Sequence, residues 1–242
     1  MKISIVGCLF VLDSIKSDYI KKNDTKVLNV VLNKETKELI NVEFDEKSDI
    51  KELIRERISG VIESDKFHLE QVYTLGENKY YDDKKIDIIY MALTNSENIK
   101  KMDAKYELVP FNLKDSNIEL GNKAFKFKTK EKVKNNNIEY YHDVKTDDLK
   151  TEKKIIELLT VYKYLRFRID NTDVCFKLLP ELFALEDVRI LYEMIKDTSV
   201  DKSNFRKKIL KFCEKTDVII GDKGYRPTQM YKFNPENNDT WL

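Results

Sequence analysis

The sequence predicts an α+β protein in which a mixed-sheet domain precedes a smaller domain of helices and a hairpin. The first observation is a series of short, β-rich apolar segments, separated by polar loops, that fills residues 1–148. The second is a change near Lys145, after which apolar residues recur at helical spacing. The third is the end of the chain, where strand-like segments flank a glycine-containing loop. We therefore expect one domain over residues 1–148 and another over residues 149–242.

Several segments of the first half have the composition of β-strands. They are residues 3–13, 26–33, 67–75, 86–94, 106–113, 123–130 and 138–144. One helix interrupts them, with Ser48 as its expected N-cap and apolar residues at helical spacing from Ile50 to Val61. A single helix among many strands favours an α+β domain built on a mixed sheet.

The second half begins with a long helix that starts near Thr151. Its apolar side chains form a stripe, which predicts core packing. The stripe consists of Ile155, Leu158, Leu159, Tyr162 and Leu165. Further helices are expected over residues 185–195 and from near residue 201, and a hairpin over residues 218–233. Helices followed by a hairpin are the outline of a winged helix-turn-helix domain.

The composition excludes several kinds of site. Cys8, Cys175 and Cys213 are far apart and lack a CxxC spacing, which fits buried thiols in a reducing cytoplasm better than disulfides or a zinc ribbon. His68 and His142 are isolated, so a multi-histidine metal site within one chain is excluded. No run approaches the ~18 apolar residues of a membrane helix. The run before Cys8 is also shorter than that of a signal peptide. We therefore predict a cytoplasmic protein without a cofactor, a metal site or a membrane partner.

The charge is distributed unevenly along the chain. The whole sequence has a net charge of +1, whereas residues 199–232 contain nine Lys or Arg and four Asp or Glu. A local basic patch on a nearly neutral protein is compatible with nucleic-acid binding. On charge alone, a solvated surface is the simpler explanation.

The helix that starts near residue 201 has one apolar and one cationic side. With Phe205 in the core, Ile209 and Phe212 fall on the same side. The other side carries cations that can meet phosphates, and Asn and Arg side chains that can pair with base edges. The predicted DNA-binding residues of this helix are Ser203, Asn204, Arg206, Lys207, Lys208 and Lys211. Leu210 also falls on the polar side and would have to contact the hairpin. An ordinary surface helix is the alternative.

The loop of the hairpin supplies three further candidates. Gly221 and Gly224 permit tight backbone turns. Lys223 and Arg226 are placed to reach the phosphate backbone or the minor groove, and Tyr225 lies beside them. An ordinary surface hairpin remains the alternative.

Three stretches resemble the Nudix-related transcriptional regulator family. They are "LLPELFALEDVRILYEMI" at residues 178–195, "VDKSNFRKKI" at residues 200–209 and "GYRPTQMYKF" at residues 224–233. In the first half, "HLEQVYTLG" at residues 68–76 is similar to the segment that follows the Nudix helix. Members of the family are bacterial repressors with an N-terminal Nudix-like domain and a C-terminal winged helix. The resemblance therefore implies binding to double-stranded DNA.

The Nudix box of the family is degenerate in this chain. When the box is anchored on Arg55 and Glu56, other residues replace most of its glycines and glutamates. These replacements are Asn41, Lys47, Ser59, Gly60 and Ile62. In working enzymes the glutamates hold divalent cations, which need several oxygen ligands. The resemblance thus implies a domain with no catalytic residues, in which Arg55 could keep a structural pairing.

The effector of such a domain would be an ADP-ribose-type metabolite, as the resemblance implies. The family has an Arg-Asp-Pro-Arg-like run near this ligand, and here the chain reads "YYDDKK" at residues 80–85. We predict that a small nucleotide-like effector contacts Arg55, Tyr80, Tyr81 and Lys84. The aromatic rings could stack on a base and Lys84 could meet a phosphate. A solvated loop is the alternative for each residue.

The sequence thus predicts a DNA-binding transcriptional regulator with a catalytically inactive, effector-sensing Nudix-like domain. A homodimer is expected because helix-turn-helix proteins commonly read paired half-sites. The long helix from Thr151 is a candidate for the dimer interface or for linking the domains. An active Nudix pyrophosphohydrolase with a winged helix, or an adaptor whose winged helix binds protein, are the alternatives.

Overall fold

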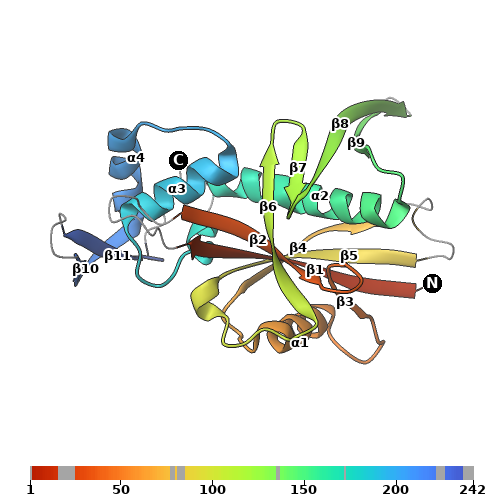
Figure 1. The fold of residues 1–242 in the computed structure, drawn as a ribbon, viewed down its shortest axis with the longest axis horizontal. Helices are drawn as coiled ribbons and strands as arrows, with labels where there is room; N and C mark the ends of the chain where they lie inside the picture. The colour runs from red at the N-terminus through yellow and green to blue at the C-terminus, as the bar shows by residue number, and fades with distance from the viewer. Residues whose placement is uncertain are drawn as a thin grey trace.

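The computed structural model describes residues 2–15, 25–76, 80, 85–134, 137–171, 173–221 and 227–236. A nine-stranded mixed sheet is covered by helices on both faces, and a separate two-stranded hairpin lies at one end of the molecule (Figure 1). The sheet consists of β1 (Lys2–Ile15), β2 (Thr25–Asn33), β3 (Ile40–Glu43), β4 (His68–Leu75), β5 (Lys85–Asn95), β6 (Tyr106–Lys114), β7 (Asn117–Leu120), β8 (Lys123–Lys134) and β9 (Asn137–Val144). The predicted α+β class is confirmed.

Strand β1 lies in the middle of the sheet. The strand order is β4-β5-β1-β2-β6-β7-β8-β9, and β3 pairs with the first part of β1. β1 runs parallel to β5, with Ile5 opposite Ile88, whereas the other pairings among the described strands are antiparallel. A parallel pair needs a crossover connection, and the chain between β1 and β5 contains helix α1 (Ile50–Ile62).

Helix α1 covers one face of the sheet. Its apolar side packs on alternate residues of β1, such as Ile5 and Leu9. The approach is close at Gly7, where an added Cβ would lie 3.0 Å from Ile58 Cδ1. The N-cap is Asp49, not the expected Ser48. Its carboxylate accepts hydrogen bonds from two backbone amides of the first turn, which satisfies donors that the helix leaves free.

Helix α2 (Leu149–Asn171) covers the opposite face (Figure 1). The predicted apolar stripe is buried against the sheet, as the helical spacing indicated. Tyr162 lies at its centre, with ring centroids 6.1 Å from Phe10 and 5.0 Å from Phe111. Cys8 lies in the same core and Cys175 is also buried, whereas Cys213 is only half-buried; all three are free thiols.

A buried cluster of charges joins β5 to the start of α2. Lys153 forms ion pairs with the carboxylates of Asp87 and Glu157, and Lys85 approaches Asp87 from the other side at 3.9 Å. Asp87 is fully buried and Glu157 nearly so. Burial raises the pKa of the Glu157 carboxyl to about 7, even though the charge of Lys153 acts in the opposite direction.

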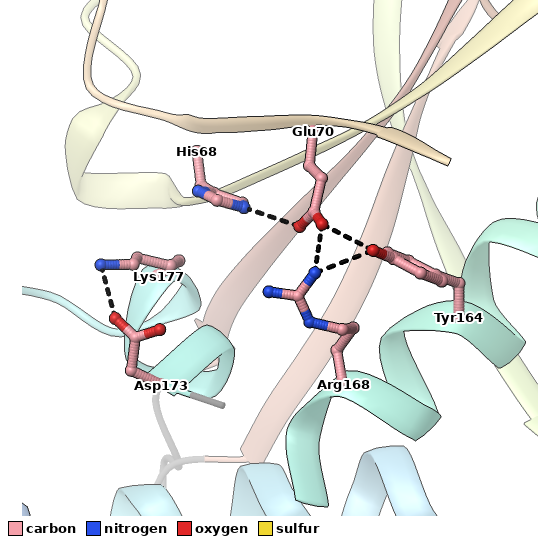
Figure 2. Close-up of polar contacts among 6 residues, drawn as sticks. All are labelled: His68, Glu70, Tyr164, Arg168, Asp173 and Lys177. Carbon is pink, nitrogen blue, oxygen red and sulfur yellow. Dashed lines mark hydrogen bonds and ion pairs between the residues drawn. The ribbon is translucent and has the colours of Figure 1, made fainter. Parts of the chain in front are cut away.

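A polar cluster centred on Glu70 joins strand β4 to the later part of α2 (Figure 2). Tyr164 donates a hydrogen bond to Glu70 Oε1 at 2.5 Å, and Arg168 pairs with the same oxygen. His68 contacts the other carboxylate oxygen at 3.3 Å. Burial alone would raise the pKa of Glu70, but the hydrogen bonds from Tyr164 and His68 and the charge of Arg168 lower it.

The C-terminal part contains two short helices and the hairpin. Its elements are the 3-10 helix Asp173–Leu178, α3 (Leu185–Lys196), α4 (Lys202–Ile209), the 3-10 turn Leu210–Phe212, β10 (Cys213–Ile220) and β11 (Thr228–Phe233). In the sheet domain, Ser96–Asn98 also forms a 3-10 turn. The hairpin thus begins at Cys213, earlier than the expected Val218. These elements form the predicted C-terminal winged helix. Their buried side chains continue the core between the sheet and α2 without a break.

Polar contacts also hold the winged helix against the sheet. Lys26 on β2 forms an ion pair with Asp187 in the first turn of α3 at 3.1 Å. Asn95 at the end of β5 donates a hydrogen bond to the carbonyl of Leu179 at 2.9 Å. Helix α2 also contacts both parts of the chain, because its apolar stripe packs in the core with the sheet and Tyr162 donates a hydrogen bond to the carbonyl of Ile195 in α3 at 3.3 Å.

Candidate nucleic-acid interface

Helix α4 presents a cationic surface because its apolar side is buried. Asp201 caps the helix, accepting a hydrogen bond from the Asn204 amide at 2.8 Å. Phe205 and Ile209 are buried, and so is Phe212 in the following turn. The polar residues predicted on the other side are exposed to solvent. They are Ser203, Asn204, Arg206, Lys207, Lys208 and Lys211.

The cations in the middle of α4 are available to a partner. Within the described part of the chain, no carboxylate pairs with Arg206, Lys207 or Lys208. Unpaired, solvent-exposed cations on one helix face attract a polyanion. Binding it costs little free energy, because no internal ion pair has to be broken. Leu210 follows the last residue of α4. We expected the hairpin to cover this side chain, but it is 38% exposed.

The β10–β11 hairpin stands next to α4 in the position of a wing. Its register shifts between Lys215 and Ile219, and Gln229 bridges the irregular region by donating to the carbonyls of Thr216 and Val218 at 2.6 and 3.2 Å. Ile219 and Ile220 are about 60% exposed. The predicted wing residues Lys223, Tyr225 and Arg226 lie outside the described residues.

A groove of about 740 Å³ separates α4 from the first half of α3 and from β11. Three cations and one carboxylate line it together with apolar residues. The lining residues used below are Glu186, Arg189, Lys202, Arg206 and Gln229. Arg189 is not among the residues that the sequence predicted for the site, since the apolar stripe is the dominant pattern of its helix. The signal was present in the chain, since acidic residues stand three residues before and four residues after Arg189.

Of the predicted effector residues, the structure describes Arg55 and Tyr80, and it does not bring these two together. Arg55 lies on α1, where its guanidinium is 5.3 Å from the centre of the Phe67 ring and 3.9 Å from Glu52. Tyr80 donates a hydrogen bond to Glu152 of α2 at 3.1 Å. These helices cover opposite faces of the sheet (Figure 1). Tyr81 and Lys84 lie outside the described residues.

The residues that the sequence resemblance aligns with the Nudix glutamates lie on and before α1. Glu56 is exposed, and Ser59 donates a hydrogen bond to Asp65 at 2.5 Å. Among the described residues, no three His, Cys, Asp or Glu side chains are grouped as ligands of a metal ion.

None of the helices in the described ranges combines the length and the apolar character needed to span a bilayer.

Comparisons with known proteins identify the C-terminal part. Residues 175–233 match the family described as NrtR DNA-binding winged helix domain. No curated protein sequence matches the chain significantly.

Solved structures match the fold along nearly the whole chain. The crystal structure of Shewanella oneidensis NrtR has a TM-score of 0.67 and 13% identity, covering 99% of this chain and 98% of that one. The crystal structure of the same protein complexed with a 27mer DNA has a TM-score of 0.66 and 13% identity, covering 99% of this chain and 97% of that one. The crystal structure of a MutT/nudix family protein from Enterococcus faecalis has a TM-score of 0.64 and 12% identity, covering 96% of this chain and 88% of that one. The chain therefore carries an NrtR-type winged helix behind a Nudix-like sheet domain, which is the architecture of the Nudix-related transcriptional regulators that the sequence resembled.

Proposed function

We propose that this protein is a transcriptional regulator that binds double-stranded DNA through α4 and the β10–β11 wing. The observation that carries the proposal is the exposed trio Arg206, Lys207 and Lys208 on α4, which pairs with no carboxylate among the residues that the structure describes. This helix lies within the segment that matches the NrtR DNA-binding winged helix family. The cations would neutralise phosphates, and Asn204 and Arg206 are the side chains able to form paired hydrogen bonds with base edges.

A homodimer is part of this proposal. Helix-turn-helix dimers place two recognition helices about 34–36 Å apart, so that each reads one half-site. The apolar stripe of α2 is already buried within one molecule, so these side chains are not available to a second copy. The dimer interface would then be formed by another surface.

Binding to duplex DNA should be strongly dependent on salt. If about six phosphates are neutralised per dimer, the logarithm of the binding constant should fall with the logarithm of salt concentration with a slope of roughly −5. Arg206→Ala should cost about 1–3 kcal/mol of binding if the side chain reaches a base. The measurement is fluorescence anisotropy on a genomic fragment that the purified protein retains.

A matched control separates this surface from overall charge. Replacing Lys47, Lys51 and Lys66 by alanine removes the same charge from exposed positions of the sheet domain. That variant should bind nearly as the parent does, whereas alanine at Arg206, Lys207 and Lys208 should abolish most of the affinity. Unchanged binding by the α4 variant would place the site elsewhere. Absence of any DNA affinity at low salt would favour the adaptor alternative.

We further propose that the Nudix-like domain senses a nucleotide-like effector and does not hydrolyse it. Lys47, Ser59 and Gly60 stand where the box requires glutamates, so oxygen ligands for divalent cations are lacking at these positions. ADP-ribose or a related metabolite is the effector class that the family resemblance favours. Since Arg55 and Tyr80 lie on opposite faces of the sheet, one ligand would contact the Tyr80 region or Arg55, but not both.

Mixed with ADP-ribose and Mg²⁺, the protein should bind the ligand without turning it over. Calorimetry would measure binding with and without DNA, and chromatography would measure hydrolysis. A tenfold weaker affinity for DNA must be matched by tenfold weaker effector binding to the DNA complex, which corresponds to about 1.4 kcal/mol of coupling. Turnover that disappears in Glu56→Gln would instead support the pyrophosphohydrolase alternative. Equal effector affinity in both states would leave the domain as a scaffold.

A further inference from the structure

Two cations of the groove between α3, α4 and β11 converge on one carboxylate. Arg189 donates from Nη2 to Glu186 Oε1 at 2.5 Å and from Nε to Oε2 at 3.0 Å. Lys202 of α4 places its ammonium 3.7 Å from Glu186 Oε1. All three residues line the groove, and so does Arg206, which pairs with no carboxylate in the described part of the chain.

The donors of this arrangement fit the oxygens of a planar or tetrahedral anion. A guanidinium presents two parallel N–H donors that fit a carboxylate or a phosphate equally well. Glu186 lies in the first turn of α3, where the helix dipole favours negative charge. The hydrogen bonds from Arg189 lower the pKa of Glu186, which keeps its carboxylate charged at neutral pH.

The arginine is held in place independently of Glu186. Its Nη1 atom pairs with Glu193, one turn further along α3. The other oxygen of Glu193 accepts a hydrogen bond from the Val200 amide at 2.9 Å. The Arg189 side chain is 13% exposed, whereas that of Glu186 is 38% exposed. Glu186 can therefore leave the fork while Arg189 keeps its orientation.

We propose that the groove is a phosphate-binding subsite of the DNA interface, and that Glu186 occupies it in the free protein until a DNA phosphate displaces it. The inference rests on the proposed DNA-binding function and adds Arg189 and Lys202 to the residues that contact the backbone. Glu186 acts as an internal counterion, because it neutralises cations that would otherwise attract phosphate. It therefore weakens binding to every duplex without changing which sequence is preferred.

Glu186→Gln should bind DNA more tightly than the parent protein. Each protomer gains one cation that is free to meet a phosphate, which steepens the salt slope by about 0.9 per protomer. For a dimer this corresponds to an additional change of about tenfold in relative affinity between 50 and 200 mM salt. Anisotropy on the retained fragment and on an unrelated duplex should show the same gain.

Glu181→Gln is the matched control, since Glu181 is exposed, lies outside the groove and loses the same charge. The gain in DNA affinity from Glu181→Gln should be clearly smaller than the gain from Glu186→Gln. In a Lys202→Gln background, the gain in DNA affinity from Glu186→Gln should be smaller, because one of the two cations that Glu186 neutralises is already absent. Lys202 is 72% exposed, so Lys202→Gln should leave the fold intact. Equal gains in Glu181→Gln and Glu186→Gln, or no gain in Glu186→Gln, would overturn the inference. If the parent protein does not bind DNA at low salt, the proposed function itself fails.

Discussion

Tyr162→Ala is expected to lower the free energy of unfolding by about 3–5 kcal/mol, as for other large aromatic residues truncated in a core. The Tyr162 side chain is 1% exposed and fills the space between Phe10, Phe111 and helix α2. Its hydroxyl donates to the carbonyl of Ile195 at 3.3 Å, so the ring also supports the end of α3. Unfolding in guanidinium, followed by circular dichroism, would measure the loss.

Tyr162→Phe is the control because it keeps the ring and removes the hydroxyl alone. It should cost only about 1 kcal/mol. The carbonyl of Ile195 would still accept a hydrogen bond from Arg166 Nε at 2.5 Å. If Tyr162→Phe were as damaging as Tyr162→Ala, hydrogen bonding and not packing would dominate at this position. A loss below about 1 kcal/mol for Tyr162→Ala would show that the core collapses around the missing ring.

Lys153→Met is expected to lower the free energy of unfolding by a similar amount, about 3–5 kcal/mol at pH 8, because it removes the cation that pairs with buried Glu157 and leaves Asp87 with the more distant Lys85. Asp87 and Glu157 both depend on the Lys153 ammonium. The loss should be smaller at pH 5.5, where Glu157 can bind a proton. Combining Lys153→Met with Asp87→Asn and Glu157→Gln should restore much of the stability, because the buried charges then disappear together.

The same cluster gives the parent protein a pH dependence of known sign. The pKa of Glu157 is about 7 in the folded protein and has an ordinary value of 4.5. Between these values the folded protein holds a proton that the unfolded chain has released, so the contribution of Glu157 to stability falls as the pH rises. Glu157→Gln should remove this contribution. For Lys153→Met, an equal loss of unfolding free energy at pH 8 and at pH 5.5 would show that altered packing, and not the unpaired charges, destabilises that variant.

Local patterns predicted much of the fold. The stripe on α2 and the buried side of α4 follow from helical spacing, which is set by the backbone alone. The burial of Ile155 and Phe205 could therefore be anticipated. The sheet order could not, because the parallel pairing of β1 with β5 depends on contacts between residues far apart in the chain.

The candidate site was predictable to different extents. Exposure of Arg206 and its neighbours follows from the same helical spacing. The groove carboxylate was not predicted, since the contact of Glu186 with Lys202 joins two helices whose relative position depends on tertiary packing. The predicted effector residues were taken from two separate segments through the family resemblance, and the sequence does not show that Arg55 lies on α1 while Tyr80 contacts α2 on the opposite face of the sheet. The sequence predicted Ser48 as the N-cap of α1, whereas Asp49 caps the helix; both residue types are good caps, and composition alone cannot choose between adjacent residues.

The uninterrupted core between the sheet and the winged helix limits how this protein could have been assembled during evolution. Domains that are joined by exposed linkers can be exchanged between genes as independent units. Here the apolar stripe of α2 lies against the sheet, and the buried residues of α3 and α4 continue that core. A recombination event that replaced only the winged helix would expose apolar surface on the part left behind. A new winged helix would therefore be inherited together with a matching α2 and a matching face of the sheet.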